Sequence, residues 1–439
     1  MTLNKNILHL ALPAIASNIT VPLLGLCDTA ITGHLGSETY IAAIAAGSMM
    51  LNMLFWLCSF FRMGTTGLAA EAYGENSPRK QLSVLLRAST LALFISLTLV
   101  ILSKPLSSIL LSVINPSPES SMLAVEYFLI CIWGAPPLLV MLSVNGWFIG
   151  MQNTILPMVI SISMNIINVV ASLVAVFILH LGFIGVAIGT LLSNWCALIL
   201  ALILLRHFVK GCGFSFRNIS LSGIIRTDGF RKFFNVSITL FFRSACIMLV
   251  TVAVTSLGAR MGDITLAANA IIMQLFLFFS YFIDGFAFAA EALCGKFFGE
   301  KDILQLKKTV RALLNWATTV TCLFLIIYGF AANEFISLLT DLPAVRQACA
   351  DMHLFIFLLP LVSLLAFIFD GVYTGLTATW RMMITTFVAA AVFAVIAFIL
   401  PALLSLPLNN YILWSAFLIY LFIRGCGLAI QLPSVLRAS

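Results

Sequence analysis

Long apolar segments separated by short polar ones run along the whole 439-residue chain. A helix needs about 20 mostly apolar residues to cross the hydrocarbon core of a bilayer. On that basis the pattern predicts about twelve membrane-spanning helices, at 7–33, 40–70, 83–113, 122–149, 154–179, 184–208, 233–257, 265–295, 309–337, 350–376, 382–403 and 410–433. Several of these segments exceed thirty residues, so we expect some helices to tilt, bend or extend beyond the lipid.

The composition predicts the same fold class. The chain is 62% hydrophobic and 9% charged, whereas soluble domains average about 25% charged residues. A soluble protein of this length has too large an exterior to bury so much apolar surface. We therefore expect an all-α integral membrane protein. Its ten cysteines are scattered singly, which is typical of small buried side chains rather than of metal ligands.

Lysine and arginine are distributed unequally between the two sets of loops. If both termini are cytoplasmic, seventeen of these residues lie in inside segments and three lie in outside loops. Loops rich in Lys and Arg remain in the cytoplasm, so we expect both termini to be cytoplasmic. The basic loop at 207–232 is then an orientation signal, and we expect no nucleic-acid partner.

Two sequence patterns recur at an offset of 225 residues. The segment NGWFIG at 145–150 aligns with DGVYTG at 370–375, and EAYGE at 71–75 aligns with KFFGE at 296–300. Two patterns that share one offset indicate an internal duplication. The chain is therefore predicted to consist of two halves with six helices each.

We place the N-terminal lobe at 1–209, a basic cytoplasmic linker at 210–232, and the C-terminal lobe at 233–439. Because six is an even number, both halves cross the membrane in the same sense. Such parallel repeats are related by an axis along the membrane normal. Two pseudo-symmetric bundles of this kind can enclose a central cleft that opens to either side.

Charged side chains within the predicted helices are the first candidates for function, because each costs at least about 2.5 kcal/mol to insert. Asp28 lies deep in the segment 7–33, where the nearest preceding basic residue is Lys5. Burial disfavours the charged form of a lone carboxyl group, so Asp28 could bind and release a proton as its access to water changes. We interpret Asp28 as a coupling residue; the alternative is a hydrogen-bonded structural residue near the helix end.

Polar side chains also lie in two neighbouring segments, 154–179 and 184–208, where lipid-facing residues would be apolar. They are Asn165, Asn168, Thr190, Ser193 and Asn194. Their oxygens could hydrogen-bond Asp28 or ligate a small cation. Hydrogen bonding between helices is the equally supported alternative.

The second half contains charges of both signs within its predicted helices: Arg243, Asp284, Glu291, Asp370 and Arg424. Opposite charges in adjacent helices suggest pairing, for example of Arg243 with Asp284 or with Asp370. Asp284 and Glu291 are two turns apart and can share a helix face. Glu291 is nearer the predicted cytoplasmic end, where contact with water is the simpler interpretation.

Five motifs carry a family resemblance. The segment PLLGLCDTAITGHLG at 22–36 resembles the opening signature of the multidrug and toxic compound extrusion (MATE) family. The segments RMGTTGL at 62–68, NGWFIGMQN at 145–153, DGFAFAAEA at 284–292 and RGCGL at 424–428 resemble the branch named for the DNA-damage-inducible protein F. Together the motifs extend from one end of the chain to the other.

The resemblance implies twelve helices in two lobes that form a V-shaped central cleft. It also implies a bacterial cytoplasmic-membrane antiporter that moves organic compounds outward while protons or sodium ions move inward. Asp28 matches the carboxylate that is treated as the coupling site in this family, and Asn165 matches an asparagine near it. Thr190 is similar in position to a threonine of the same site.

One position departs from the family pattern. Relatives often carry a second carboxylate four residues after the asparagine, where this chain has Val169. Asn168 is rotated by about 100° around the helix and does not replace it. One negative charge makes a poor sodium site, which favours proton coupling through Asp28 alone or through a set that includes Asp284 and Asp370.

The sequence thus predicts alternating-access export of amphipathic, often cationic, compounds. A lipid-linked oligosaccharide flippase is the alternative, and it would need a strongly cationic cavity, for which the predicted helices supply Arg62, Arg243 and Arg424. The chain contains neither H-E-x-x-H nor G-x-S-x-G, and its histidines are scattered, so we do not expect an enzyme. We expect no cofactor besides the coupling ion. The expected partners are small organic substrates and the lipid bilayer. We also expect the protein to function as a monomer.

Overall fold

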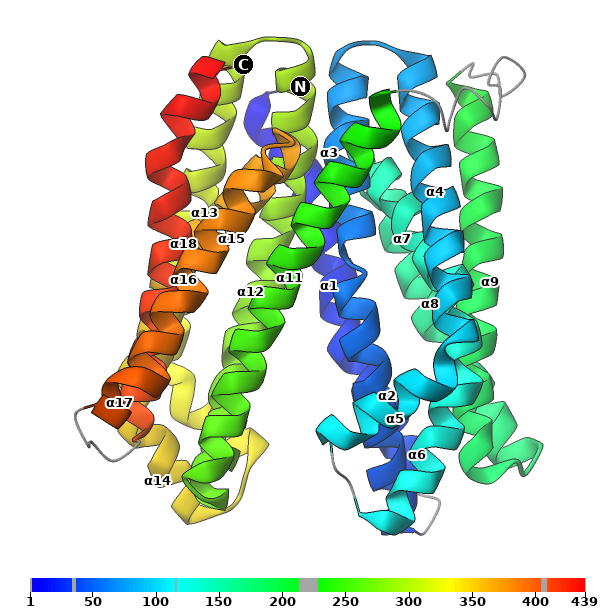
Figure 1. The fold of residues 1–439 in the computed structure, drawn as a ribbon, viewed down its shortest axis with the longest axis vertical. Helices are drawn as coiled ribbons and strands as arrows, with labels where there is room; N and C mark the ends of the chain where they lie inside the picture. The colour runs from blue at the N-terminus through cyan, green and yellow to red at the C-terminus, as the bar shows by residue number, and fades with distance from the viewer. Residues whose placement is uncertain (1, 34–36, 115–116, 213–227, 404–408, 439) are drawn as a thin grey trace. The chain divides into compact units, whose positions relative to one another are not determined.

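Figure 1 shows the computed structural model, which describes residues 2–33, 37–114, 117–212, 228–403 and 409–438. Every element in these ranges is a helix. Twelve segments are long and apolar enough to cross a membrane. Helices suit this solvent because they satisfy their backbone hydrogen bonds internally, where lipid offers none. The predicted all-α membrane class and the number of spans are confirmed.

Some spans consist of more than one helix. The first six spans and their connections contain α1 (Leu3–Gly33), α2 (Glu38–Leu57), α3 (Phe60–Gly74), α4 (Pro78–Ile101), α5 (Ser103–Ile114), α6 (Pro118–Cys131), α7 (Ala135–Gly150), α8 (Ile155–Leu173) and α9 (Gly182–Gly211). The last six contain α11 (Asp228–Arg260), α12 (Asp263–Gly299), α13 (Ile303–Leu339), α14 (Pro343–Asp351), α15 (His353–Gly375), α16 (Thr379–Ala394), α17 (Leu400–Leu403) and α18 (Asn410–Ala438).

Two of the predicted segments extend beyond the span into a second helix, since the spans are Pro78–Ile101 and His353–Gly375. The segment 83–113 covers most of α4 and α5, which are interrupted at Leu102. The segment 350–376 covers the end of α14 and all of α15, which begins after Met352. Both errors have the same cause, because an apolar run does not reveal where a helix stops and a second, shorter helix begins.

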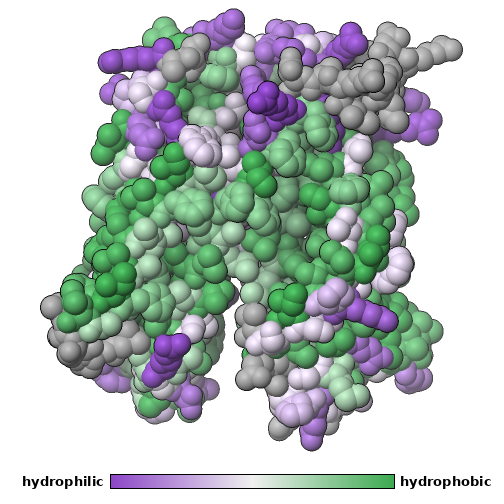
Figure 2. Space-filling model, viewed as in Figure 1, coloured by the Kyte–Doolittle hydropathy of each residue, from purple (hydrophilic) through white to green (hydrophobic). Residues whose placement is uncertain are grey.

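The surface of the molecule is apolar where a bilayer would cover it. In the view of Figure 2, apolar residues cover the middle of each unit, between polar residues nearer its two ends. Large apolar side chains are exposed in spans of both halves, among them Ile101, Phe330 and Ile430, with exposed fractions of 78%, 86% and 78%. Such a continuous apolar surface needs a partner, and here lipid is that partner.

The described chain forms two compact units, Met1–Ile15 with Ile238–Ser439, and Ala16–Ser237. The first turns of α1 pack against α12, where Gly285 lies against the Ala11 carbonyl group and the Ile15 side chain. The first turns of α11 join the other unit, where Lys232 forms an ion pair of 2.7 Å with Glu71. The units therefore differ at both boundaries from the sequence lobes 1–209 and 233–439, which remain a prediction about the repeat. Residues 213–227 of the predicted linker lie outside the described ranges.

The internal repeat is visible as one helix crossing that occurs in both units. Gly146 of α7 faces the Arg62 carbonyl oxygen of α3, and Gly371 of α15 faces the Ala287 carbonyl oxygen of α12. Both residues of the second pair are displaced by 225 positions from the first. The turns that follow these helices also correspond, with left-handed residues at Asn76 and Lys301, and at Gln152 and Thr377.

The next glycine along each crossing allows the two backbones to approach closely. A Cβ atom on Gly150 would lie 2.8 Å from the Thr66 carbonyl oxygen, and one on Gly375 would lie 2.7 Å from the Glu291 carbonyl oxygen. Small residues at such crossings are what membrane helices use for tight packing. The predicted duplication therefore corresponds to a shared packing geometry.

We expect Gly375→Ala to destabilise the folded protein by about 1–3 kcal/mol, because the new Cβ atom must displace the α12 backbone. Gly329→Ala is the matched control, because its Cβ would lie 3.9 Å from Phe357 and would meet no backbone. Unfolding in detergent micelles, followed by circular dichroism, measures both variants. Equal stabilities for the two would show that the crossing tolerates a wider separation of the helices.

Candidate functional site

Asp28 lies near the end of α1, one turn before Thr32. The Thr32 hydroxyl donates a hydrogen bond of 2.6 Å to the Asp28 carbonyl oxygen, which reinforces the backbone of the last turns. The Asp28 side chain is half-buried. Its Oδ1 atom is shielded from solvent and accepts no hydrogen bond, and the carboxyl group forms no ion pair with any described residue.

The polar residues of α8 and α9 form a small hydrogen-bonded cluster. The Asn168 side-chain amide donates to Thr190 Oγ1 at 3.2 Å and to Ser193 Oγ at 3.5 Å. Thr190 donates in turn to the Val186 carbonyl oxygen at 3.1 Å. Asn168 is 2% exposed, and its Oδ1 atom has no hydrogen-bond partner. Of the interpretations that the sequence left open for these residues, hydrogen bonding between the two helices is the one observed.

Tyr127 of α6 connects this cluster to Asp28. Its side chain is 2% exposed, and its hydroxyl group lies close to the side chains of Ser48 of α2 and Thr190 of α9. Asp28 lies within electrostatic range of the Tyr127 hydroxyl. A chain of polar groups therefore leads from the carboxyl group of α1 to the asparagine of α8.

Sequence reasoning missed Tyr127 and Ser48. The sequence does contain one indication of this contact, because Gly47 directly precedes Ser48 in an otherwise apolar run. A Cβ atom at Gly47 would lie 2.7 Å from the Tyr127 ring. The glycine therefore makes room for the tyrosine, and a glycine–serine pair inside a membrane span can indicate a buried polar contact.

Asn165 lies at a different level of the bundle. Its side-chain amide donates a hydrogen bond of 2.8 Å to Thr20 of α1. Thr20 precedes Asp28 by eight residues, which is about 12 Å along a helix. The structure thus joins Asn168 to the polar cluster that contains Thr190, whereas Asn165 ties α8 to α1 about two turns away.

Among the described residues, acidic side chains do not gather around Asp28. Within the described residues, no three or more His, Cys, Asp and Glu side chains gather as potential metal ligands. Val169, at the position of the family's second carboxylate, is an apolar, partly exposed residue. A hard cation prefers six or more oxygen ligands with several negative charges among them, which this cluster does not supply from its side chains.

The other unit holds a buried ionic cluster. Asp370 of α15 accepts hydrogen bonds through Oδ2 from Arg243 of α11 and from Arg424 of α18, the latter at 2.6 Å. The three residues are between 5% and 7% exposed. Arg424 also lies over the Tyr420 ring, 5.3 Å from its centroid. Of the two predicted partners for Arg243, the structure shows Asp370.

The two acidic residues of α12 differ in their exposure. Asp284 is partly exposed and lies within electrostatic range of Tyr281. Glu291 is 1% exposed. The interpretation that Glu291 simply reaches water is therefore wrong, because the close crossing of α12 with α15 at Gly375 covers it.

Comparison with known proteins tests these features. The MatE family model matches the chain twice, over residues 13–174 and 239–400. The chain belongs to the MatE family. The two matches fall in the two halves of the repeat, and the family resemblance of the sequence is confirmed.

Relatives of this MatE chain are found among bacterial proteins. It is 35% identical to the DNA damage-inducible protein F of Escherichia coli over 97% of the chain and 91% of that protein. It is 26% identical to the "Probable multidrug resistance protein NorM" of Acinetobacter baylyi over 80% of the chain and 78% of that protein. The chain is also similar in structure to a crystal structure of MATE in the bent conformation, with a TM-score of 0.87 and 16% sequence identity. The match covers 100% of this chain and 97% of that one, and it confirms the fold.

Proposed function

We propose that this MatE protein exports amphipathic, often cationic, organic compounds from the cytoplasm while protons move inward. The relatives named for multidrug resistance support the substrate class. The protein would lie in the cytoplasmic membrane of a bacterium, with both termini inside, as the Lys and Arg distribution favours. Each chain contains both halves of the repeat, which supports function as a monomer.

The observation that carries the proton-coupling proposal is the state of the Asp28 carboxyl group. Its Oδ1 atom is buried and has no hydrogen-bond partner, and no cation neutralises it within the described residues. An ionised carboxylate in this place is penalised by desolvation, whereas a protonated one is not. The arrangement of α1 around Asp28 therefore depends on whether a proton is bound.

Alternating access can use this dependence. When Asp28 faces the outside, it takes up a proton, loses its charge and allows the end of α1 to repack against the polar cluster of Tyr127 and Thr190. This repacking weakens the binding of substrate, which leaves outward. A return to the inward-facing state exposes Asp28 to the cytoplasm, where the proton is released. A proton that binds more tightly to one state than to the other is sufficient to shift the equilibrium between them.

The buried arginines of the other unit bear on the alternative of a lipid-linked oligosaccharide flippase. A pyrophosphate would need cationic groups that are available to it. Arg243 and Arg424 instead share the Asp370 carboxylate. This observation favours a structural role for the cluster and leaves the exporter as the better-supported function.

The test is transport by purified wild-type protein in proteoliposomes with an imposed pH difference, with and without sodium. We expect a fluorescent organic cation to accumulate against its gradient when only protons drive transport, and sodium to add nothing. With one proton per substrate, about two pH units support about a 100-fold substrate ratio. Accumulation that requires sodium would refute the coupling proposal, and movement of a lipid-linked sugar without dye transport would favour the flippase.

A further inference from the structure

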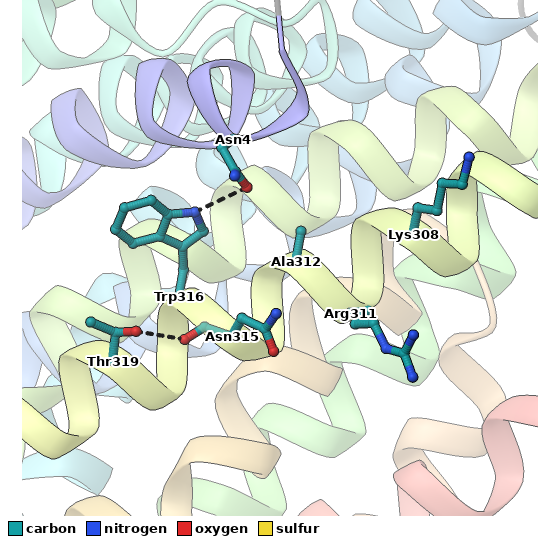
Figure 3. A pocket seen from close by; sticks show the side chains of 7 residues that line it. All are labelled: Asn4, Lys308, Arg311, Ala312, Asn315, Trp316 and Thr319. Carbon is teal, nitrogen blue, oxygen red and sulfur yellow. Dashed lines mark hydrogen bonds between the residues drawn. The ribbon is translucent and has the colours of Figure 1, made fainter.

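A pocket of about 510 Å³ lies beside the first turns of α13, where α1 begins. It is lined by Asn4 of α1 and by Lys308, Arg311, Ala312, Asn315, Trp316 and Thr319 of α13. Figure 3 shows the Asn4 amide and the Trp316 ring facing each other from the two helices. All these residues belong to the same compact unit. Neither the coupling proposal nor the ionic cluster of Asp370 uses this pocket.

The pocket is positively charged. Lys308 and Arg311 are three positions apart on α13, so both project from the same face. Both are exposed, and neither has a hydrogen bond or an ion pair within the described residues. The lining contains no acidic side chain. Two free cations without a counter-charge attract an anion, and a phosphate group suits an arginine and a lysine together.

The opposite wall of the pocket is fixed in place. The Trp316 indole nitrogen donates a hydrogen bond of 3.4 Å to Asn4 Oδ1. The indole ring stacks against Phe286 of α12, with centroids 6.4 Å apart and planes at 17°. Since Asn4 accepts through its oxygen, its amide nitrogen remains a donor for a ligand. Tryptophan is also the residue type that is enriched at the boundary between lipid and water.

The same face of α13 becomes apolar beyond the pocket. Leu323, Ile326 and Phe330 follow Thr319 at helical spacing, and they are 54%, 58% and 86% exposed. A helix of 37 residues is about 55 Å long, whereas the hydrocarbon core is about 30 Å thick. The first turns of α13 therefore extend to the level of the headgroups, while Leu323 to Phe330 face the acyl chains.

We propose that this pocket binds the phosphate of an anionic phospholipid. Lys308 and Arg311 neutralise the phosphodiester, and the Asn4 amide donates to the headgroup. An acyl chain then runs along α13 past Trp316 and ends near Leu323, about 18 Å beyond Arg311 along the helix axis. A soluble phosphate would find only the cationic half of this surface. The apolar half is what distinguishes a lipid from a free anion. This site does not depend on the coupling ion or on the transported compound.

The test measures lipid binding to the purified full-length protein by native mass spectrometry and by thermal shift, with phosphatidylglycerol compared with phosphatidylcholine. We expect phosphatidylglycerol to bind preferentially. The variant Lys308→Gln/Arg311→Gln should weaken its binding about 30-fold, because each cation near an anionic lipid contributes a factor of about five. The matched control is Lys301→Gln/Lys307→Gln, which removes the same charge from outside the pocket and should change binding by less than about twofold.

Two further arms identify the ligand. Inorganic phosphate and glycerol 3-phosphate at the same concentration are expected neither to stabilise the protein nor to displace the lipid. The proposal is wrong if they compete as well as the lipid does, if both double variants weaken binding equally, or if phosphatidylcholine binds as tightly. Both target side chains are exposed, so the variants should fold; Lys308→Glu, which reverses one charge, provides a second variant with the same expected direction.

Discussion

Asp28→Asn is expected to abolish proton-driven accumulation of substrate. Asparagine has nearly the same size as the protonated aspartic acid, but it cannot release a proton. The variant should therefore fold, since its buried Oδ1 position has no partner to lose, and it should resemble the protonated state at every pH. Substrate would still cross the membrane down its own gradient, but the pH difference would no longer drive it.

The effect can be measured in the same proteoliposomes as the wild-type protein. Where the wild type reaches a substrate ratio of about 100 under two pH units, Asp28→Asn should remain near equal concentrations. Exchange of labelled for unlabelled substrate, without any pH gradient, should continue at raised substrate concentration, because the protonated-like state binds substrate more weakly. Asp28→Glu keeps the titratable group and is expected to retain part of the accumulation, which separates the loss of the proton from the loss of shape.

Asp284→Asn and Asp370→Asn are the comparison variants, because a coupling set in the second half was the other interpretation of the sequence. Full accumulation by Asp28→Asn would make Asp28 a structural residue. If either second-half variant folds and alone loses the response to pH, coupling belongs there. The exchange assay is essential to this comparison, because a variant that has lost substrate binding fails in both assays.

The sequence predicts the spans and the duplication well, for reasons that the structure makes plain. A lipid-facing helix must be apolar over about 20 residues, so the runs of apolar residues reveal the spans directly. The repeat was detectable because Gly146 and Gly371 must each face a carbonyl oxygen of a crossing helix. A close contact between two backbones tolerates few substitutions. The same residue type, glycine, therefore occurs at the same spacing in both halves.

The partners of the polar residues were harder to predict. Asn165 and Asn168 are three positions apart in a uniformly apolar helix, and the sequence does not say which of them faces α9. The structure shows that Asn168 does, through Thr190 and Ser193. Tyr127 comes from α6, about forty residues earlier in the chain. Contacts of this kind depend on the rotation of each helix about its own axis. The hydropathy pattern does not define this rotation, because both the lipid-facing and the buried sides of these helices are apolar.

The two units differ in how they treat a buried carboxyl group. Asp28 has no cationic partner within the described residues, whereas Asp370 is held between Arg243 and Arg424. Protonation of Asp28 removes an uncompensated charge. Protonation of Asp370 would instead leave two guanidinium groups in a buried place without their counter-charge, which is strongly unfavourable. The units thus share a packing geometry but differ in whether a cation compensates the buried carboxyl group.

Asp370→Asn is accordingly expected to destabilise the folded protein by about 3–5 kcal/mol, the usual effect of removing one partner from a buried ion cluster. Both arginines lose the same acceptor, because both donate to Oδ2. Denaturant unfolding in mixed micelles, followed by circular dichroism, measures the loss. Asp341→Asn is the matched control, because its side chain is fully exposed and its ion pair with Arg346 is expected to contribute almost nothing.

A triple variant separates the loss of charge balance from the loss of the cluster itself. Arg243→Met/Asp370→Leu/Arg424→Met removes all three charges and fills the space with apolar side chains, so most of the stability should return. If the triple variant is as unstable as Asp370→Asn, the hydrogen bonds of the cluster are themselves required. If it is stable but transports nothing, whereas Asp28→Glu still does, the arginines contact the substrate and the cluster is more than a structural clamp between α11, α15 and α18.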